Sequence, residues 1–278
     1  MPRKPDLPRR WMIRTLALLS VCILFFLLRL VAESARQVSR PITAGQINQT
    51  NLWTDEIFIG GTPFYHRGID FPGNMGTDVH AVDAGKVVQI YDLTDNNTFG
   101  NAAWGNFVVI RHFKTHWDQT NLPNAGPSFV YSIYLHLERG SIDLVVGQDV
   151  DANQVIARRD NTGRSTGSHL HLQVVLNPDS GALLIPTNTL DSENKVRNPE
   201  LWVEPLDNTG IAIGKVTDSN GDPVWNLLVC GIHKDTAGYV SSRTYSFNWA
   251  NQDDILHENF GTTDVDVQPG LYYIYAID

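Results

Sequence analysis

The stretch HLHLQVVL, residues 169–176, constrains the fold most strongly, because histidine and apolar residues alternate along its first half. Residues i and i+2 of a β-strand share one face, so this alternation predicts a strand. In such a strand His169 and His171 lie side by side on one face, and Leu170 and Leu172 point into a core on the other. Imidazole both binds metals and transfers protons near neutral pH, so the polar face predicts a functional site.

The chain after Trp53 has the pattern of an all-β protein with antiparallel sheets. Short apolar runs alternate with clusters of Gly, Asn, Asp and Pro, and no long stretch carries a helical period. The polar stretches 96–104 and 114–128 are expected to form walls of a substrate groove, since long loops on a β scaffold commonly do so. The runs expected to form strands are residues 78–93, 105–113, 129–137 and 169–176.

The N-terminus has the pattern of a membrane signal. Basic residues precede an uninterrupted apolar run of 14 residues, Thr15–Leu28, and such an arrangement keeps the N-terminus in the cytoplasm and sends the rest outward. The run has the length of a signal-peptide core, yet Trp11–Ala32 spans 22 residues and could cross a bilayer. We therefore expect residues 1–35 to form an uncleaved transmembrane helix or, as the second choice, a cleaved signal peptide.

Charge and cysteine content exclude two other classes of protein. Residues 1–40 hold eight of the 21 Lys and Arg but only two of the 30 Asp and Glu, so residues 41–278 carry a net charge of −15. A body this acidic is repelled by phosphate backbones, and no nucleic-acid partner is expected. The chain has only two cysteines, Cys22 and Cys230, so it is not a disulfide scaffold.

Composition divides the remaining chain into three parts. Residues 36–52 are polar and lack periodicity, which predicts a linker. Residues 53–206 contain the histidine motifs. Residues 207–278 contain short strand and turn signals, GKVTDSNGDPV at 214–224 and PGLYYIYAID at 269–278, and are expected to form a small β-sandwich.

Two further motifs carry potential ligands. In HRGID, His66 and Asp70 are four residues apart, and Gly68 with the FPG that follows disfavours a helix. In a straight strand the two residues would lie about 13 Å apart, so the chain must bend at Gly68 if both bind one ion. His136 follows Tyr134 at the end of an apolar run. Taken alone, these residues do not decide which histidine binds a metal and which transfers a proton.

Together, the three motifs resemble the lysostaphin-like (LytM-type) zinc endopeptidases that cut peptidoglycan peptides. The resemblance covers residues 60–205 and rests on FYHRGID, YLHL and TGRSTGSHLH, which occur in that order. Ala157 and Asp160 depart from it, because they occupy positions that are often glycine. The resemblance implies one zinc ion held by His66, Asp70 and His171, with His169 as the catalytic base and His136 beside it, either orienting His169 or stabilising the oxyanion.

The resemblance also implies the function and location of the protein. We expect an endopeptidase that hydrolyses peptide bonds of bacterial peptidoglycan in the extracytoplasmic cell envelope, either anchored in the membrane or secreted. The alternative is a non-catalytic relative that binds wall peptides and activates another hydrolase. Such relatives usually lack one or more ligands, whereas all five positions are filled here. Residues 207–278 resemble the carboxypeptidase-regulatory-like or Ig-like sandwiches appended to secreted enzymes.

Overall fold

The computed structural model describes residues 38–48, 56–59, 62–92, 104–112, 129–177, 196–234, 238–243, 260–266 and 275–277. All of them belong to one compact unit, Gln37–Asp278. None of the helices formed by these residues is long and apolar enough to cross a membrane. The N-terminal helix expected within residues 1–35 lies outside the described residues, as do most of the two long loops expected to wall a groove.

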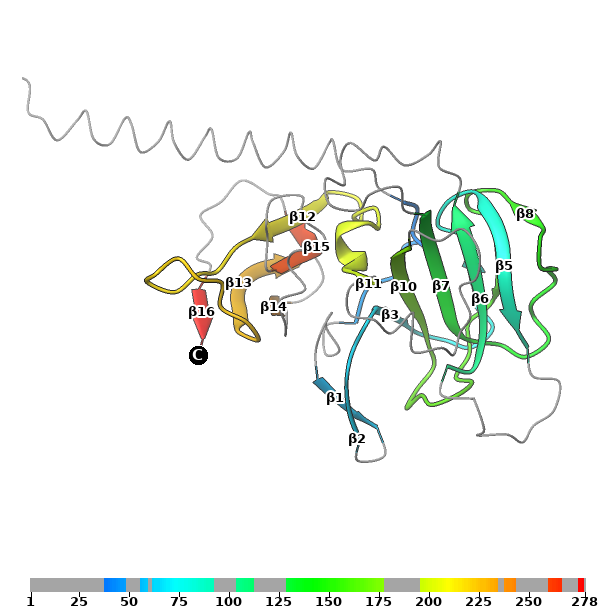
Figure 1. Ribbon diagram of the computed structural model, residues 1–278, viewed down its shortest axis with the longest axis horizontal. Helices are drawn as coiled ribbons and strands as arrows, with labels where there is room; N and C mark the ends of the chain where they lie inside the picture. Colours follow the sequence, from blue (N-terminus) through cyan, green and yellow to red (C-terminus); the bar gives the residue numbers. More distant parts are fainter. Residues whose placement is uncertain are drawn as a thin grey trace, which may run out of the picture. The chain divides into compact units, whose positions relative to one another are not determined.

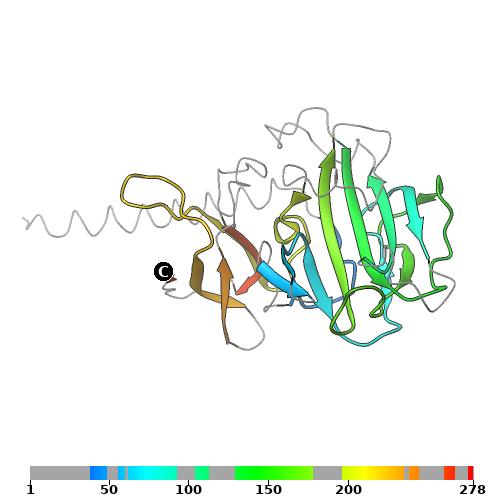
Figure 2. The ribbon, with the colours of Figure 1, turned by 60° about the horizontal axis from the view of Figure 1, so that its bottom comes forward.

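A seven-stranded antiparallel sheet dominates the first part of the described chain (Figure 1). The strand β3 (Ile69–Pro72) pairs with β10, and Figure 2 shows the two alongside each other. Two-stranded antiparallel pairs are formed by β1 (Glu56–Ile59) with β2 (Thr62–Tyr65) and by β4 (Asp78–His80) with β9 (Val155–Arg158). The other strands of the large sheet, in spatial order, are β11 (Val196–Arg197), β10 (His169–Asn177), β7 (Phe129–Leu137), β6 (Asn106–His112), β5 (Gly85–Tyr91) and β8 (Asp149–Val150).

The described elements confirm the all-β, antiparallel class predicted from the sequence, and three of the four expected strands match within a residue at each end. The exception is residues 78–93, which form two strands, β4 and β5, instead of one. Between them the Asp83 carboxylate accepts a hydrogen bond from Ala84 N at 2.8 Å. Such a local side-chain-to-backbone bond competes with a strand ladder and explains the break.

The two faces of the large sheet bury different clusters. Leu170, Leu172, Val174 and Leu176 of β10 point into the larger apolar core, whereas Val175 joins a smaller cluster on the opposite face. His169, His171 and Gln173 share that opposite face by the alternation of the strand. The alternation predicted for this strand is therefore confirmed, and β10 carries polar groups at one end of a face that is apolar at the other.

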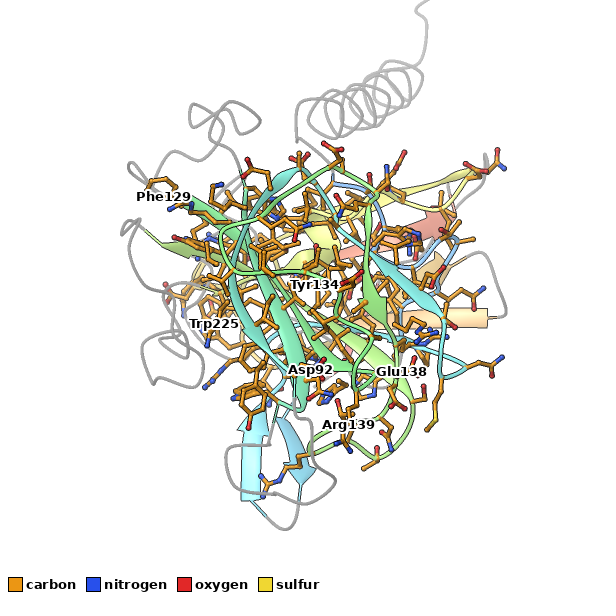
Figure 3. The ribbon with its side chains drawn as sticks, turned by 90° about the vertical axis from the view of Figure 1, so that its right-hand side faces the viewer. Asp92, Phe129, Tyr134, Glu138, Arg139 and Trp225 are labelled. Atoms are coloured by element: carbon orange, nitrogen blue, oxygen red, sulfur yellow. The ribbon has the colours of Figure 1, made fainter. Side chains whose placement is uncertain are left out.

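A buried chain of hydrogen bonds fixes β7 against its neighbours. The hydroxyl of Tyr134, labelled in Figure 3, accepts from Val82 N at 2.8 Å and lies 2.9 Å from Ser132 Oγ. Ser132 Oγ in turn lies 2.9 Å from His112 Nε2, and the other ring nitrogen of His112 donates to Ala84 O at 3.1 Å. Burial raises the pKa of Tyr134, so its hydroxyl stays neutral. His112 therefore has a structural part.

The turn after β7 is fixed by a carboxylate from the end of β5. Asp92 accepts from Gly140 N at 3.0 Å, and Figure 3 labels Asp92 together with Glu138 and Arg139 of this turn. Glu138 forms an ion pair with Arg158 at 2.9 Å. These contacts hold the chain just beyond His136.

Residues 38–48, which fall within the expected linker, pack against the domain. Val38, Ile42 and Ile47 are buried in the larger core. Val38 N donates to Trp202 O at 2.7 Å, and Asn48 N donates to Asp70 O at 2.8 Å. The second of these bonds reaches β3, the strand that carries Asp70.

The described strands of residues 207–278 form one five-stranded antiparallel sheet. A short 3-10 helix, η3 (Pro199–Leu201), precedes it, and Glu200 of this helix accepts from Thr262 Oγ1 at 2.6 Å and Thr263 N at 3.0 Å. The strand expected from residue 214 ends there instead, and a turn follows. The strands of the sheet are β12 (Thr209–Gly214), β13 (Leu228–Lys234), β14 (Gly238–Arg243), β15 (Phe260–Asp266) and β16 (Tyr275–Ile277).

Candidate metal centre

The HxxxD motif bends as its spacing requires. β2 ends at Tyr65 and β3 begins at Ile69, so His66 and Asp70 are brought together across a short non-strand segment. His66 Nε2 lies 3.2 Å from Asp70 Oδ1, which confirms the expected bend. Glycine is needed at position 68 for lack of space, and not only for its flexibility. A Cβ on Gly68 would lie 2.3 Å from Leu172 O, closer than real Cβ atoms come to any atom. The bend can therefore form only because residue 68 has no side chain where it meets β10.

The pairing of β10 with β3 completes the cluster. His171 lies opposite Asp70 in the register, and its Nδ1 is 2.9 Å from Asp70 Oδ1. The same Nδ1 is 3.1 Å from His66 Nε2. Two ring nitrogens and one carboxylate oxygen thus surround a common point, and all three residues are buried.

This donor set fits a zinc ion. Ligand atoms about 2 Å from a tetrahedral ion lie about 3.3 Å from one another, and the three distances here are 2.9, 3.1 and 3.2 Å. Two imidazoles and one carboxylate are a known ligand set of catalytic zinc. Three protein ligands leave one tetrahedral position for water or substrate.

The electrostatics of the cluster favour the protonation states that bind a metal. Burial alone would raise the pKa of Asp70, but the charge on His66 and hydrogen bonds from His171 and His66 outweigh it and hold that pKa well below its ordinary value. Burial lowers the pKa of His171 to about 4. At neutral pH the carboxylate is therefore ionised and the imidazole is neutral, and these are the charge states in which the two groups can bind a metal.

His169 lies at the edge of the cluster. Its Nδ1 donates to Gly167 O at 2.8 Å, since a carbonyl only accepts. A neutral ring then has its lone pair on Nε2, and this atom lies 3.5 Å from Asp70 Oδ1. With 17% of its side chain exposed, against 7% for His171, His169 is the histidine of the pair that solvent reaches more easily.

A bulge in β7 brings His136 to the same site. In a regular strand His136 would share the core face with Tyr134, as its spacing predicts. Its φ is +63°, in the left-handed region, and the register with β6 shifts between Val108 and Asn106. The bulge turns His136 to the opposite face, where its ring centroid lies 4.6 Å from that of His169 and 6.1 Å from that of His171.

Thr162 holds His136 in this position. His136 Nδ1 donates to Thr162 O at 2.7 Å. Thr162 Oγ1 accepts from Asn106 N at 3.0 Å and donates to Leu137 O at 2.7 Å, so one side chain spans the bulge. Burial, followed by the nearby His169 and His171, lowers the pKa of His136 to about 3, and the ring is neutral.

Sequence reasoning missed three residues that organise the site. Besides Thr162, Asp160 links two of the histidines through its backbone: its N donates to His136 O at 3.1 Å and its O accepts from His169 N at 3.2 Å. The role is played by the main chain, so the departure from glycine at this position removes nothing from the site. Arg159 donates to Phe71 O at 3.2 Å and Pro72 O at 3.0 Å, which fixes the end of the strand that carries Asp70. The NTG that precedes RSTGSHLH was the available signal for Thr162.

Residues 64–181 match the sequence profile of peptidase family M23. This segment is an M23 domain. It includes all five histidine and aspartate positions described above.

Two curated proteins are similar to the chain over this segment. A peptidoglycan DD-endopeptidase, ShyA from Vibrio cholerae, is 34% identical over 111 residues, which are 40% of this chain and 20% of that protein. Lysostaphin from Staphylococcus staphylolyticus is 32% identical over 117 residues, 42% of this chain and 20% of that protein. The chain thus spans about one fifth of the length of these relatives.

Solved M23-type structures are also similar to the chain. The catalytic domain of lysostaphin from Staphylococcus simulans has a TM-score of 0.38 and 24% identity, over 56% of this chain and 90% of that one. A zinc containing peptidase from Vibrio cholerae has a TM-score of 0.37 and 28% identity, over 51% of this chain and 37% of that one.

Proposed function

We propose that the protein is a zinc-dependent endopeptidase that hydrolyses peptide bonds of bacterial peptidoglycan. The observation that carries the proposal is the buried triangle of His66 Nε2, Asp70 Oδ1 and His171 Nδ1, with sides of 2.9 to 3.2 Å, beside two further histidines. The substrate class comes from the relative that is named as a peptidoglycan DD-endopeptidase.

His66, Asp70 and His171 would hold the zinc ion. When bound, zinc polarises the scissile carbonyl and lowers the pKa of water at the open position. Hydrogen bonds to the main chain hold Asp70 in place. The Asp70 carbonyl oxygen accepts from Asn48 N at 2.8 Å, and Arg159 donates to Pro72 O at the end of the same strand. Such support keeps the donor atoms in place before the ion arrives.

His169 would act as the general base. Its Nδ1–H is held by Gly167 O at 2.8 Å, so the basic Nε2 faces the metal cluster. From there it can accept a proton from the attacking water as the new C–O bond forms, and then give that proton to the leaving amine as the C–N bond breaks. Its exposure, greater than that of the ligands, is consistent with a group that must meet substrate.

His136 would support His169 as a hydrogen-bond acceptor, not as a donor to the oxyanion. Its Nδ1–H is used by Thr162 O at 2.7 Å, so Nε2 of the neutral ring has only a lone pair to offer. Donation to an oxyanion would need the protonated ring, which burial and the neighbouring His169 oppose. Of the two roles that the resemblance leaves open, this geometry supports the first, orienting His169, because Nε2 of His136 can accept a hydrogen bond from protonated His169.

The test is cleavage of purified peptidoglycan by the purified protein. We expect soluble fragments to appear, to require zinc, and to disappear with His169→Ala, while mass spectrometry of the new termini names the bond that is cut. Zinc bound at full occupancy with no cleavage of any wall tested would support the alternative, a wall-binding relative that activates another hydrolase.

We further propose that residues 1–35 anchor the protein in the cytoplasmic membrane, with the M23 domain outside. The support is the basic segment followed by the apolar run Thr15–Leu28. Protease added to intact spheroplasts should degrade the M23 domain. Protection of the domain until the cells are lysed would contradict the proposal.

A further inference from the structure

The two nitrogens of the His171 ring face different partners. Nδ1 points to Asp70 Oδ1 at 2.9 Å and His66 Nε2 at 3.1 Å. Nε2 lies 3.1 Å from the side-chain amide of Gln173, which is buried on the same face of β10.

Binding a metal through Nδ1 dictates where the proton of His171 must be. A neutral imidazole has one N–H and one lone pair, so a lone pair on Nδ1 requires the proton on Nε2. That N–H is buried, and a buried donor without an acceptor costs about 1–3 kcal/mol. The other side of Nε2 is closed by the main chain, because a Cβ on Gly68 would lie 2.5 Å from this atom. The Gln173 side-chain amide lies within hydrogen-bond distance of this atom, at 3.1 Å, and can supply the acceptor.

A glutamine suits this position because its amide offers both an acceptor and a donor. Gln173 Nε2 faces His171 Nε2, and this pairing suits a ring whose proton is on Nδ1 and is donated to Asp70. A turn of the amide by about 180° exchanges its nitrogen and oxygen in nearly the same space. The oxygen then accepts from Nε2–H and leaves the Nδ1 lone pair for the ion.

We propose that Gln173 is a positioning residue for the metal centre: its side-chain oxygen accepts from His171 Nε2–H in the metal-bound protein, and its side-chain nitrogen donates to the same atom in the metal-free protein. Gln173 thereby selects the ring tautomer that each state needs. The inference rests on the proposed zinc site, and it goes beyond that site by assigning a residue that binds neither metal nor substrate. Partners of this kind that orient a ligating histidine typically change metal affinity by about 10–100-fold when removed.

The experiment compares zinc affinity of the full chain, purified in mild detergent, with two variants of Gln173. Chelator competition should give a Kd about 10–100-fold weaker for Gln173→Met, which keeps the length of the side chain but has no amide. Gln173→Glu supplies only acceptors and should restore a Kd at or below that of the wild type. Gln154→Met is the matched control: it removes the amide of a half-buried glutamine that accepts from Asp151 N at 3.0 Å, and its Kd should be unchanged.

Nitrogen NMR of the histidine rings gives a second readout that simple loss of packing would not produce. In metal-free wild-type protein His171 should carry its proton on Nδ1, and in metal-free Gln173→Glu on Nε2. The inference is overturned if Gln173→Met binds zinc within about two-fold of the wild type, if Met and Glu weaken binding equally, or if the tautomer does not change. Failure of the wild type to bind zinc would instead refute the proposed metal centre itself.

Discussion

Gly68→Ala should disable the metal centre with the smallest possible side chain. The added methyl carbon would lie 2.3 Å from Leu172 O and 2.5 Å from His171 Nε2. The first neighbour is backbone of the strand that carries His171, so it cannot rotate away. The φ of Gly68 is outside the left-handed region, and alanine meets no backbone strain there. The whole effect should therefore come from steric overlap.

The size of the effect follows from the overlap. Ordinary contacts of a Cβ begin at 3.4 Å, so the methyl group and β10 must separate by about 1 Å. Metal-to-ligand distances tolerate only about 0.2 Å. We expect zinc affinity to fall by at least ~100-fold, more than it falls when a residue that only orients a metal ligand is removed. We expect the free energy of unfolding to fall by ~1–3 kcal/mol because of overpacking.

The assay is chelator competition for zinc, together with urea unfolding of the metal-free protein. Gly167→Ala is the matched control, because a Cβ there meets no atom within 4 Å although the residue lies two positions from His169. It should change the free energy of unfolding by less than ~0.5 kcal/mol. Wild-type zinc affinity in Gly68→Ala would refute the argument that a close approach at this glycine builds the site.

Three further predictions concern the surroundings of the site. Thr162→Val keeps the shape of the side chain but removes both hydrogen bonds of Oγ1. It should lower the free energy of unfolding by ~1–3 kcal/mol and reduce wall cleavage, whereas Thr162→Ser should retain both hydrogen bonds. Equal loss of stability and cleavage in the two variants would contradict this prediction. Without zinc, the free energy of unfolding should decline as pH falls from about 6.5 to about 4, by up to ~1.4 kcal/mol per pH unit for each of His136 and His171. The reason is that their pKa values in the folded protein, about 3 and about 4, lie below 6.5, so the unfolded chain takes up protons first. Urea unfolding across this pH range tests the prediction, and a free energy that does not change with pH would contradict it. Tyr134→Phe should cost ~1–3 kcal/mol in the free energy of unfolding because Val82 N loses its buried acceptor, and a change below ~0.3 kcal/mol would show that the bond contributes nothing.

The sequence could predict those features that depend on strict local geometry. The period of two in HLHLQVVL correctly placed Leu170 and Leu172 in the core and the two histidines opposite them. The four-residue spacing in HRGID correctly required a bend, since no straight strand lets both side chains reach one ion. What local geometry could not supply was the reason for the glycine, which is contact with a strand about a hundred residues further along the chain.

His136 shows why the remainder was out of reach. Alternation places it with Tyr134, on the core side, and only the bulge reverses it. The bulge depends on hydrogen bonds from Thr162, which lies in another segment of the chain, and no residue near position 136 predicts those bonds. The resemblance to lysostaphin-like enzymes named His136 as part of the site, but the strand pattern alone would have left it in the interior.

The most direct test of the account is zinc stoichiometry in single variants of the cluster. The wild type and His169→Ala should each bind one zinc ion per chain, because His169 is assigned to proton transfer. His66→Ala, Asp70→Ala and His171→Ala should bind none, while circular dichroism shows that each remains folded. Full zinc content in a folded variant of any of the three ligands, or loss of zinc in His169→Ala, would contradict the division of the histidines into metal ligands and base.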